Sequence, residues 1–110
     1  MGTVYNGFIG RITMRIIKRK TLLDFWVENP DSEQHLKAWY QIANAATWTT
    51  PQDVKSQYGN ASILKDGRVV FNIKGNNYRL VVWINYDFFT IYIRFIGTHE
   101  EYDNIDVDTI

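Results

Sequence analysis

The chain has 110 residues, enough to bury one hydrophobic core but not two independent ones. Its composition, 45% hydrophobic and 15% aromatic, excludes an intrinsically disordered chain, and the lack of cysteine excludes disulfides and thiolate metal sites. Twelve basic and twelve acidic residues give a net charge of zero, which argues against a strong non-specific nucleic-acid binder because counterion release needs clustered cations.

The charge is unevenly distributed along the chain. Residues 1–20 hold five basic residues and no acidic one, whereas residues 100–110 hold five acidic residues and no basic one. Locally basic segments keep a nucleic-acid partner open, although solvated charge on a small domain is an equally ordinary interpretation. No apolar run approaches the roughly 20 residues that span a bilayer, and no signal peptide is recognisable, so we expect a cytoplasmic protein without a membrane partner.

Residues 1–13 show weak periodicity and no capping signal, and we interpret them as a flexible N-terminal extension before a single domain over residues 14–110. The helical spacing of Leu22, Phe25 and Trp26 predicts a short helix over residues 21–29, which Pro30 ends.

Two more helices are predicted before the chain changes its period. Asp31 is the predicted N-cap of a helix that runs to about Ala46, with Gln34 at the capping-box spacing. Its apolar stripe is typical of a core-facing helix rather than a ligand site. Thr50 and Pro51 then predict an N-cap and a first helical position, opening a brief helix through residue 58.

From Ala61 onward the hydrophobic period is two, which is typical of strands. The sequence predicts strands over 62–64, 68–74, 78–86 and 89–97, with turns between them, and a short acidic helix or turn after Thr98. Helices followed by an antiparallel meander predict an α+β fold, with N-terminal helices packed on one face of an antiparallel β-sheet.

Strand alternation predicts which side chains share a face. It places Phe95 on the apolar side of the last strand and Arg94 on the other side. If the register aligns the strands, Lys74, Arg79 and Arg94 gather on the face that the helices leave uncovered, where guanidinium groups suit phosphate oxygens. Alternatively, these are solvent-facing positions kept charged to discourage edge association.

His99 follows the last strand at a glycine-containing corner, and Tyr102 lies three residues beyond it. Cations, an imidazole and a phenol are the groups that metal-free cleavage of an RNA phosphodiester requires, although a lone histidine is more often a structural hydrogen-bonding group. The acidic residues around His99 are typical of a helix N-terminus as much as of a ligand set, so we expect no metal site and no cofactor.

Four stretches together resemble the HigB toxin family, a branch of the RelE-like superfamily of bacterial type II toxin–antitoxin systems. They are MRIIKRKTLLDFW, LKAWYQIANAATWTTPQDVKSQY, ASILKDGRVVFNIKGNNYRLVVWINY and YIRFIGTHEEYDNID. The resemblance covers nearly the whole chain from Met14 onward, in order. It implies a RelE-like α+β fold and a ribosome-dependent mRNA endonuclease, an mRNA interferase, in which the ribose 2′-hydroxyl attacks the adjacent phosphate without a metal ion. It also implies a HigA-like helix-turn-helix antitoxin as partner, expected in a heterotetramer.

The resemblance also implies roles for particular residues. Arg79 and Arg94 would stabilise the phosphate, His99 would transfer a proton, and Tyr102 would position the phosphate or share the transfer. A second group would contact the RNA: Arg68, Asn72, Lys74 and Asn76. The alternative within the same fold is a catalytically weak or inactive module that binds antitoxin or RNA. Antitoxin binding does not need His99, whereas cleavage does.

Overall fold

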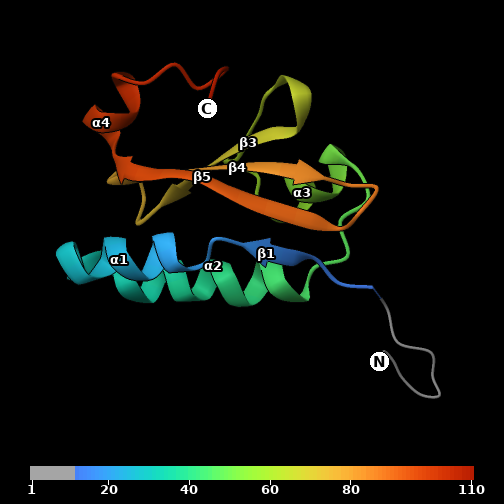
Figure 1. The fold of residues 1–110 in the computed structure, drawn as a ribbon, viewed down its shortest axis with the longest axis horizontal. Helices are drawn as coiled ribbons and strands as arrows, with labels where there is room; N and C mark the ends of the chain where they lie inside the picture. The colour runs from blue at the N-terminus through green and yellow to red at the C-terminus, as the bar shows by residue number, and fades with distance from the viewer. Residues whose placement is uncertain (1–11) are drawn as a thin grey trace.

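The computed structural model describes residues 12–110 (Figure 1). The predicted extension over residues 1–13 therefore lies outside the described residues, apart from its last two positions. The elements in chain order are β1 (Arg15–Ile17), α1 (Lys20–Glu28), the 3₁₀ helix η1 (Pro30–Ser32), α2 (Glu33–Ala45), α3 (Pro51–Gln57), β2 (Ser62–Ile63), the 3₁₀ turn η2 (Lys65–Gly67), β3 (Arg68–Ile73), β4 (Tyr78–Asn85), β5 (Thr90–Thr98) and α4 (His99–Asp103).

The five strands form one sheet in the order β1-β5-β4-β3-β2. The pairs β2–β3, β3–β4 and β4–β5 are antiparallel, as the meander predicted. β1 joins the other edge parallel to β5, with Ile16 opposite Ile91. The α+β class, with helices before the meander, is confirmed, and the sheet is mixed because of this short first strand.

The core lies between the sheet and the helix pair α1–α2, which covers one face (Figure 1). Phe71 of β3 is 1% exposed and makes edge contacts with Trp39 of α2 and Tyr58, with ring centroids 5.4 and 5.0 Å apart, and it stacks on Trp48. Aromatic packing of this kind adds to the burial of apolar area. The aromatic stripe of α2 is therefore core, as predicted.

Two of the three predicted helices begin within a residue of the predicted start. α1 covers nearly the predicted range, and Thr50 caps α3 through a capping box with Asp53. The prediction for Asp31 is wrong. A 3₁₀ turn begins at Pro30 and leads into α2, whose N-cap Ser32 makes no side-chain cap bond. The Asp31 carboxylate instead binds Lys74 and Tyr78, which are distant in sequence and invisible to a local capping pattern.

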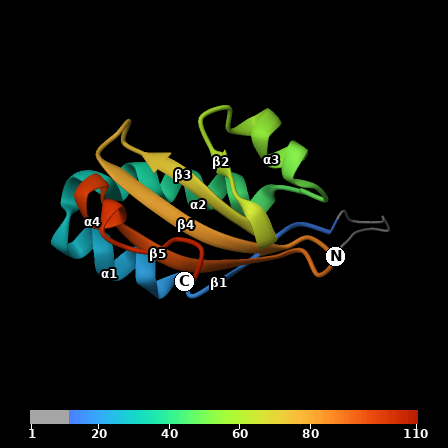
Figure 2. The same cartoon turned by 90° about the horizontal axis from the view of Figure 1, so that it is seen from above.

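The opposite face of the sheet, which we call the outer face, lies under α4 and the C-terminal segment (Figures 1 and 2). Val70 and Val81 face this side and are only 3% and 0% exposed, so the middle of the outer face is covered. Arg68 ties the end of the chain to it, because its Nε and Nη2 donate to the Ile110 carbonyl oxygen at 3.0 and 2.9 Å.

Within residues 12–110, no helix combines the length and the apolar character needed to cross a membrane.

Candidate functional site

The outer face carries the side chains that alternation placed opposite the core. Pairing across β3, β4 and β5 creates three rows, each running from one strand to the next. The rows are Arg68–Trp83–Tyr92, then Val70–Val81–Phe95, then Asn72–Arg79–Gly97. The face is thus polar or cationic at both ends and apolar in its covered middle.

A β-bulge in β5 changes which side chains reach this face. The register passes from Val82 opposite Ile93 to Val81 opposite Phe95, so Arg94 is the extra residue of the bulge. Consequently Phe95 shares the outer face with Val81, and Ile96 packs against the core. The alternation that placed Phe95 on the core side is therefore wrong beyond Ile93, because one inserted residue reverses the period of two.

Arg79 lies at the end of the outer face next to α4. It stands opposite Gly97, and its Nη1 donates to the carbonyl oxygens of Asn76 and Tyr78 at 3.2 and 3.3 Å. A Cβ at Gly97 would lie 2.6 Å from Phe95 Cζ and 2.9 Å from Glu101 Oε1, so a larger residue there would force these side chains to shift. The guanidinium is therefore held beside a crowded strand end.

α4 presents the two other predicted groups. Thr98 accepts from the Glu101 backbone N–H while the Glu101 carboxylate accepts from the Thr98 N–H, a complete capping box that fixes the helix start. The His99 N–H donates to the Asn77 carbonyl oxygen at 3.1 Å, which joins α4 to the β3–β4 turn. The His99 side chain is 55% exposed, with Nε2 3.7 Å from an Asp103 carboxylate oxygen.

The structure brings Arg79 and α4 together but sets Arg94 apart. Arg79 pairs with Gly97, which lies two residues before His99 along the chain. Tyr102 lies three residues after His99 on α4 and is partly exposed. Arg94 is exposed and three residues before Gly97, which corresponds to about 10 Å along a strand. Arg79 and Arg94 therefore lie at two separate places on the outer face.

Lys74 does not join them. It lies in the β3–β4 turn with a φ of 51°, and its ammonium contacts Asp31 of η1 at 2.8 Å. The Tyr78 hydroxyl donates to the same carboxylate at 2.5 Å. The hydrogen bonds from Lys74 and Tyr78 lower the pKa of Asp31, and the bond to Asp31 raises the pKa of the Tyr78 phenol. This cluster holds the turn against the helical layer.

The remaining predicted contacts lie at the β2–β3 side. Asn72 pairs with Arg79 across the strands, and its Nδ2 is 3.5 Å from the Asn60 carbonyl oxygen. Asn72 and Asn76 line a hollow of about 460 Å³ together with residues 57–61. Arg68 lies at the far end of the face, where the C-terminal segment already engages it.

Two aromatic residues of the outer face were not among the candidate residues that the sequence indicated. Trp83 and Tyr92 stand opposite each other with ring centroids 5.1 Å apart and ring planes inclined by 31°. Strand alternation puts Trp83 on the same side as Arg79 and Tyr92 on the same side as Arg94, so large rings on a face that carries cations were the available signal.

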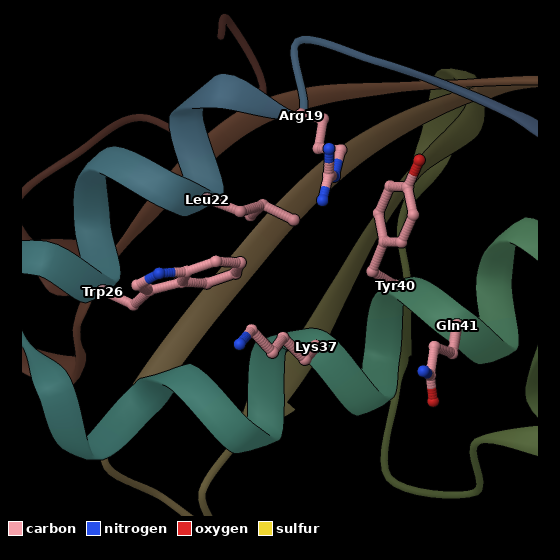
Figure 3. A pocket seen from close by; sticks show the side chains of 6 residues that line it. All are labelled: Arg19, Leu22, Trp26, Lys37, Tyr40 and Gln41. Carbon is pink, nitrogen blue, oxygen red and sulfur yellow. The ribbon is translucent and has the colours of Figure 1, made fainter.

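A separate hollow of about 280 Å³ lies between α1 and α2 in the helical layer (Figure 3). Its cations are engaged with aromatic rings: Arg19 lies over Tyr40 at 5.0 Å, and Lys37 lies over Trp26 at 5.4 Å. Cation–π contacts of this kind stabilise helix packing, and the hollow contributes no group to the outer face.

The titratable side chains of residues 12–110 include no group of three or more His, Asp or Glu placed to hold a metal ion. Asp103 is the acidic group within 4 Å of His99 in this part of the chain. The candidate groups on the outer face are guanidinium groups, an imidazole and a phenol.

Known proteins resemble the part of the chain that holds these residues. The model of the HigB toxin family, described as the RelE-like toxic component of a toxin–antitoxin system, matches residues 32–105, which include β2 to β5 and α4. The mRNA interferase toxin HigB of Escherichia coli K12 is 29% identical over 92 residues, covering 82% of this chain and 88% of that protein. The mRNA interferase HigB of Escherichia coli O6:H1 is 23% identical over 94 residues, covering 84% and 91%.

Proposed function

This chain belongs to the HigB toxin family, the RelE-like toxic component of a toxin–antitoxin system, and from that premise we propose that it is an mRNA interferase that cuts messenger RNA on the ribosome. The observation that carries the proposal is that the family match spans β4, β5 and α4, the elements that hold Arg79, His99 and Tyr102 at one end of the outer face. Two relatives of similar length named as mRNA interferases support it.

The proposed reaction is a phosphoryl transfer within the RNA. The ribose 2′-oxygen attacks the adjacent phosphorus as its proton leaves, the bond to the 5′-oxygen breaks, and that oxygen takes up a proton. The products are a 2′,3′-cyclic phosphate and a 5′-hydroxyl. The protein supplies proton transfer and positive charge, and no metal ion takes part.

His99 is the proposed proton-transfer group. Its imidazole is exposed, with Nε2 3.7 Å from an Asp103 carboxylate oxygen, and an imidazole can both accept and donate a proton. Tyr102, on the same short helix, positions the phosphate or shares the transfer. Arg79 stabilises the charge that develops on the phosphate, and Arg94 adds positive charge further along β5. Asn72 and Asn76 contact the RNA backbone or a base edge beside them, with Lys74 and Arg68 as supporting cations.

The proposed partners are the translating ribosome with its messenger RNA, and a HigA-like antitoxin with a helix-turn-helix domain, in a heterotetramer. Both place the protein in the cytoplasm. We also propose that residues 14–110 form a single toxin domain, in which Met14 is buried.

A second candidate function is an RNA-binding or antitoxin-binding module with little nuclease activity. One observation favours it. The acidic C-terminal segment covers the middle of the outer face, and the Ile110 carbonyl oxygen accepts two hydrogen bonds from the Arg68 guanidinium. Negative charge close to the proposed RNA path opposes RNA binding.

Growth after induced expression separates the two functions. Wild type should arrest growth, and co-expression of the antitoxin encoded by the neighbouring reading frame should relieve the arrest. His99→Ala and Arg79→Ala should lose the arrest while still binding the antitoxin. His35→Ala is the matched control, because His35 is an exposed histidine on α2 in the helical layer. Arrest by all four proteins would contradict the assignment of the site, and arrest by none would favour the binding module.

A further inference from the structure

Trp83 of β4 and Tyr92 of β5 form an aromatic pair on the outer face. They are direct cross-strand neighbours, with ring centroids 5.1 Å apart and planes inclined by 31°. Both side chains are partly exposed, and neither belongs to the core between the sheet and the helices. The tilted, partly exposed pair presents aromatic ring surface beside Arg68, the third member of its row.

The indole of Trp83 is fixed by the turn before β3. Its Nε1–H donates to the Asp66 carbonyl oxygen at 2.7 Å. Asp66 and Gly67 both have positive φ, 60° and 81°, and a Cβ at Gly67 would lie 2.7 Å from the Ile84 carbonyl oxygen and 3.0 Å from Trp83 Nε1. The turn therefore fits closely around the indole, and the ring is ordered before any ligand binds, which lowers the entropic cost of binding.

Guanidinium groups flank the aromatic pair on two sides. Arg68 of β3 lies opposite Trp83 and is bonded to the Ile110 carbonyl oxygen. Arg94 lies two residues after Tyr92 on β5 and is exposed, and its side chain makes no hydrogen bond or ion pair with another residue in the 12–110 range. The C-terminal segment ends over the sheet without reaching the tip of the β4–β5 hairpin (Figure 2).

We propose that Trp83 and Tyr92 stack one unpaired base of an RNA substrate, while Arg94 binds a phosphate next to it. Aromatic side chains combined with cations are how proteins hold single-stranded nucleic acid, since every base has a π-face and every nucleotide a phosphate. The proposal rests on the proposed function and adds a base-binding subsite to it. Because Arg94 is about 10 Å along the strand from Gly97, the stacked base belongs to a nucleotide near the cleaved bond, not at it.

The test measures binding of two oligonucleotides that cannot be cut. One is a single-stranded RNA hexamer with 2′-O-methyl groups, and the other is the same backbone with every base removed. The wild-type protein should bind the hexamer with bases about 5- to 150-fold more tightly, the range expected for stacking of one base on aromatic rings. Fluorescence anisotropy of labelled oligonucleotides gives both dissociation constants.

Variants assign the preference to the aromatic pair. Tyr92→Leu should bring the two dissociation constants close together, whereas Tyr92→Phe, which keeps the ring, should retain the wild-type ratio. Arg94→Ala should weaken both oligonucleotides by the same factor, and that loss should shrink at high salt because it reflects a phosphate contact. Tyr92→Val, with a strong strand former, replaces Tyr92→Leu if thermal melting shows that the leucine variant is unfolded.

An unchanged preference for bases in the folded Tyr92 variant would overturn the proposal. Equal affinity of the wild type for both oligonucleotides would overturn it too, as would no binding of either. Growth arrest by the same proteins keeps the two questions separate. A wild type that arrests growth without any base preference refutes the stacking platform alone, and a base preference without arrest refutes the nuclease and leaves the platform.

Discussion

Asp31 shows how one carboxylate joins the helical layer to the sheet. It lies in η1, and it accepts hydrogen bonds from Lys74 and Tyr78, which flank the β3–β4 turn. The same turn contains Asn77, whose carbonyl oxygen accepts from the His99 N–H. The position of α4 therefore depends in part on a residue in a 3₁₀ turn on the other side of the sheet.

The pH dependence of stability should report the Asp31 contacts. Its pKa is lowered from 3.8 in the folded state by the bonds from Lys74 and Tyr78. The stabilisation is therefore fully present above the unfolded value and is lost as pH falls through the lower folded value. We expect Asp31→Asn to lower the melting temperature near neutral pH, and the difference from wild type to shrink below about pH 4. A difference that stays constant as the pH falls further below that value would contradict the assignment.

Two tyrosines allow the contribution of a hydroxyl hydrogen bond to stability to be measured. The Tyr78 hydroxyl donates to Asp31, whereas the buried Tyr86 hydroxyl has no hydrogen-bond partner within residues 12–110. Burial, with a smaller contribution from Asp53, raises the pKa of Tyr86 to about 12. Tyr78→Phe should lower the melting temperature, and Tyr86→Phe should leave it unchanged or raise it, because no bond is lost. Thermal melts of both variants at neutral pH decide this, and equal losses would contradict it.

At the residue scale the sequence could identify candidates but not their partners. Arg79 lies at the start of β4, and His99 and Tyr102 follow the end of β5, so the antiparallel pairing of these two strands brings the two ends together. Lys74 was expected with the other cations, yet it pairs with Asp31, 43 positions away along the chain. No periodicity carries that information, since the pairing depends on how η1 packs against the β3–β4 turn.

Among the elements, α3 and α4 begin in the same way. Thr50 and Asp53 cap α3, and Thr98 and Glu101 cap α4, each with both hydrogen bonds of a capping box. The two caps differ in location, because α4 carries His99 and Tyr102 whereas α3 lies beside β2 and holds none of the proposed catalytic groups.

Removing each cap should separate stability from activity. Thr98→Ala and Thr50→Ala should each cost about 1 kcal/mol in the free energy of unfolding, the usual value for an N-cap. Only Thr98→Ala should also weaken growth arrest, because it frees the start of the helix that positions His99. Urea unfolding and growth assays provide the two readings. Equal loss of arrest in both variants would show that stability alone sets activity.

Most elements could be predicted because their signals are local. The period of two gave the four strands of the meander, and the Thr50-Pro51 pair gave the start of α3. The parallel pairing of β1 with β5 and the bulge at Arg94 could not be predicted, since both depend on register between segments far apart in sequence. The bulge matters most, because it moves Phe95 to the outer face and gives Arg94 its exposed position.

In the whole molecule, an acidic C-terminal segment lies over a sheet face that carries cations. Asp106 and Asp108 are exposed in the segment that leads from α4 to Ile110 over the outer face. Their charges oppose a phosphate backbone on that face, whereas α1, which carries Asp24 and Glu28, covers the opposite one.

Neutralising the segment should strengthen RNA binding. The double variant Asp106→Asn, Asp108→Asn should bind the uncut RNA hexamer several-fold more tightly at low salt, and the gain should fade as salt screens the charges. Asp24→Asn, Glu28→Gln removes the same number of charges from α1 and should change the affinity much less. Equal gains in the two double variants would indicate an effect of net charge rather than of the outer face.

Truncation tests the proposed boundary of the domain. Met14 is 2% exposed, and its N–H donates to the Ala46 carbonyl oxygen, so the fold requires it. Removal of residues 1–13 should leave the melting temperature and growth arrest unchanged, whereas Met14→Ala in the full chain should lower the melting temperature because a buried side chain is lost. A large loss of stability on truncation alone would refute the boundary.

The most direct test of the nuclease is the chemistry of the RNA ends in a translating cell-free system. Wild type should cut a reporter messenger RNA and leave a 2′,3′-cyclic phosphate and a 5′-hydroxyl at each cut, His99→Ala should leave the message intact, and His35→Ala should cut like wild type. Ends with a 5′-phosphate and a 3′-hydroxyl, or cleavage that survives in His99→Ala, would contradict 2′-hydroxyl attack at this end of the outer face.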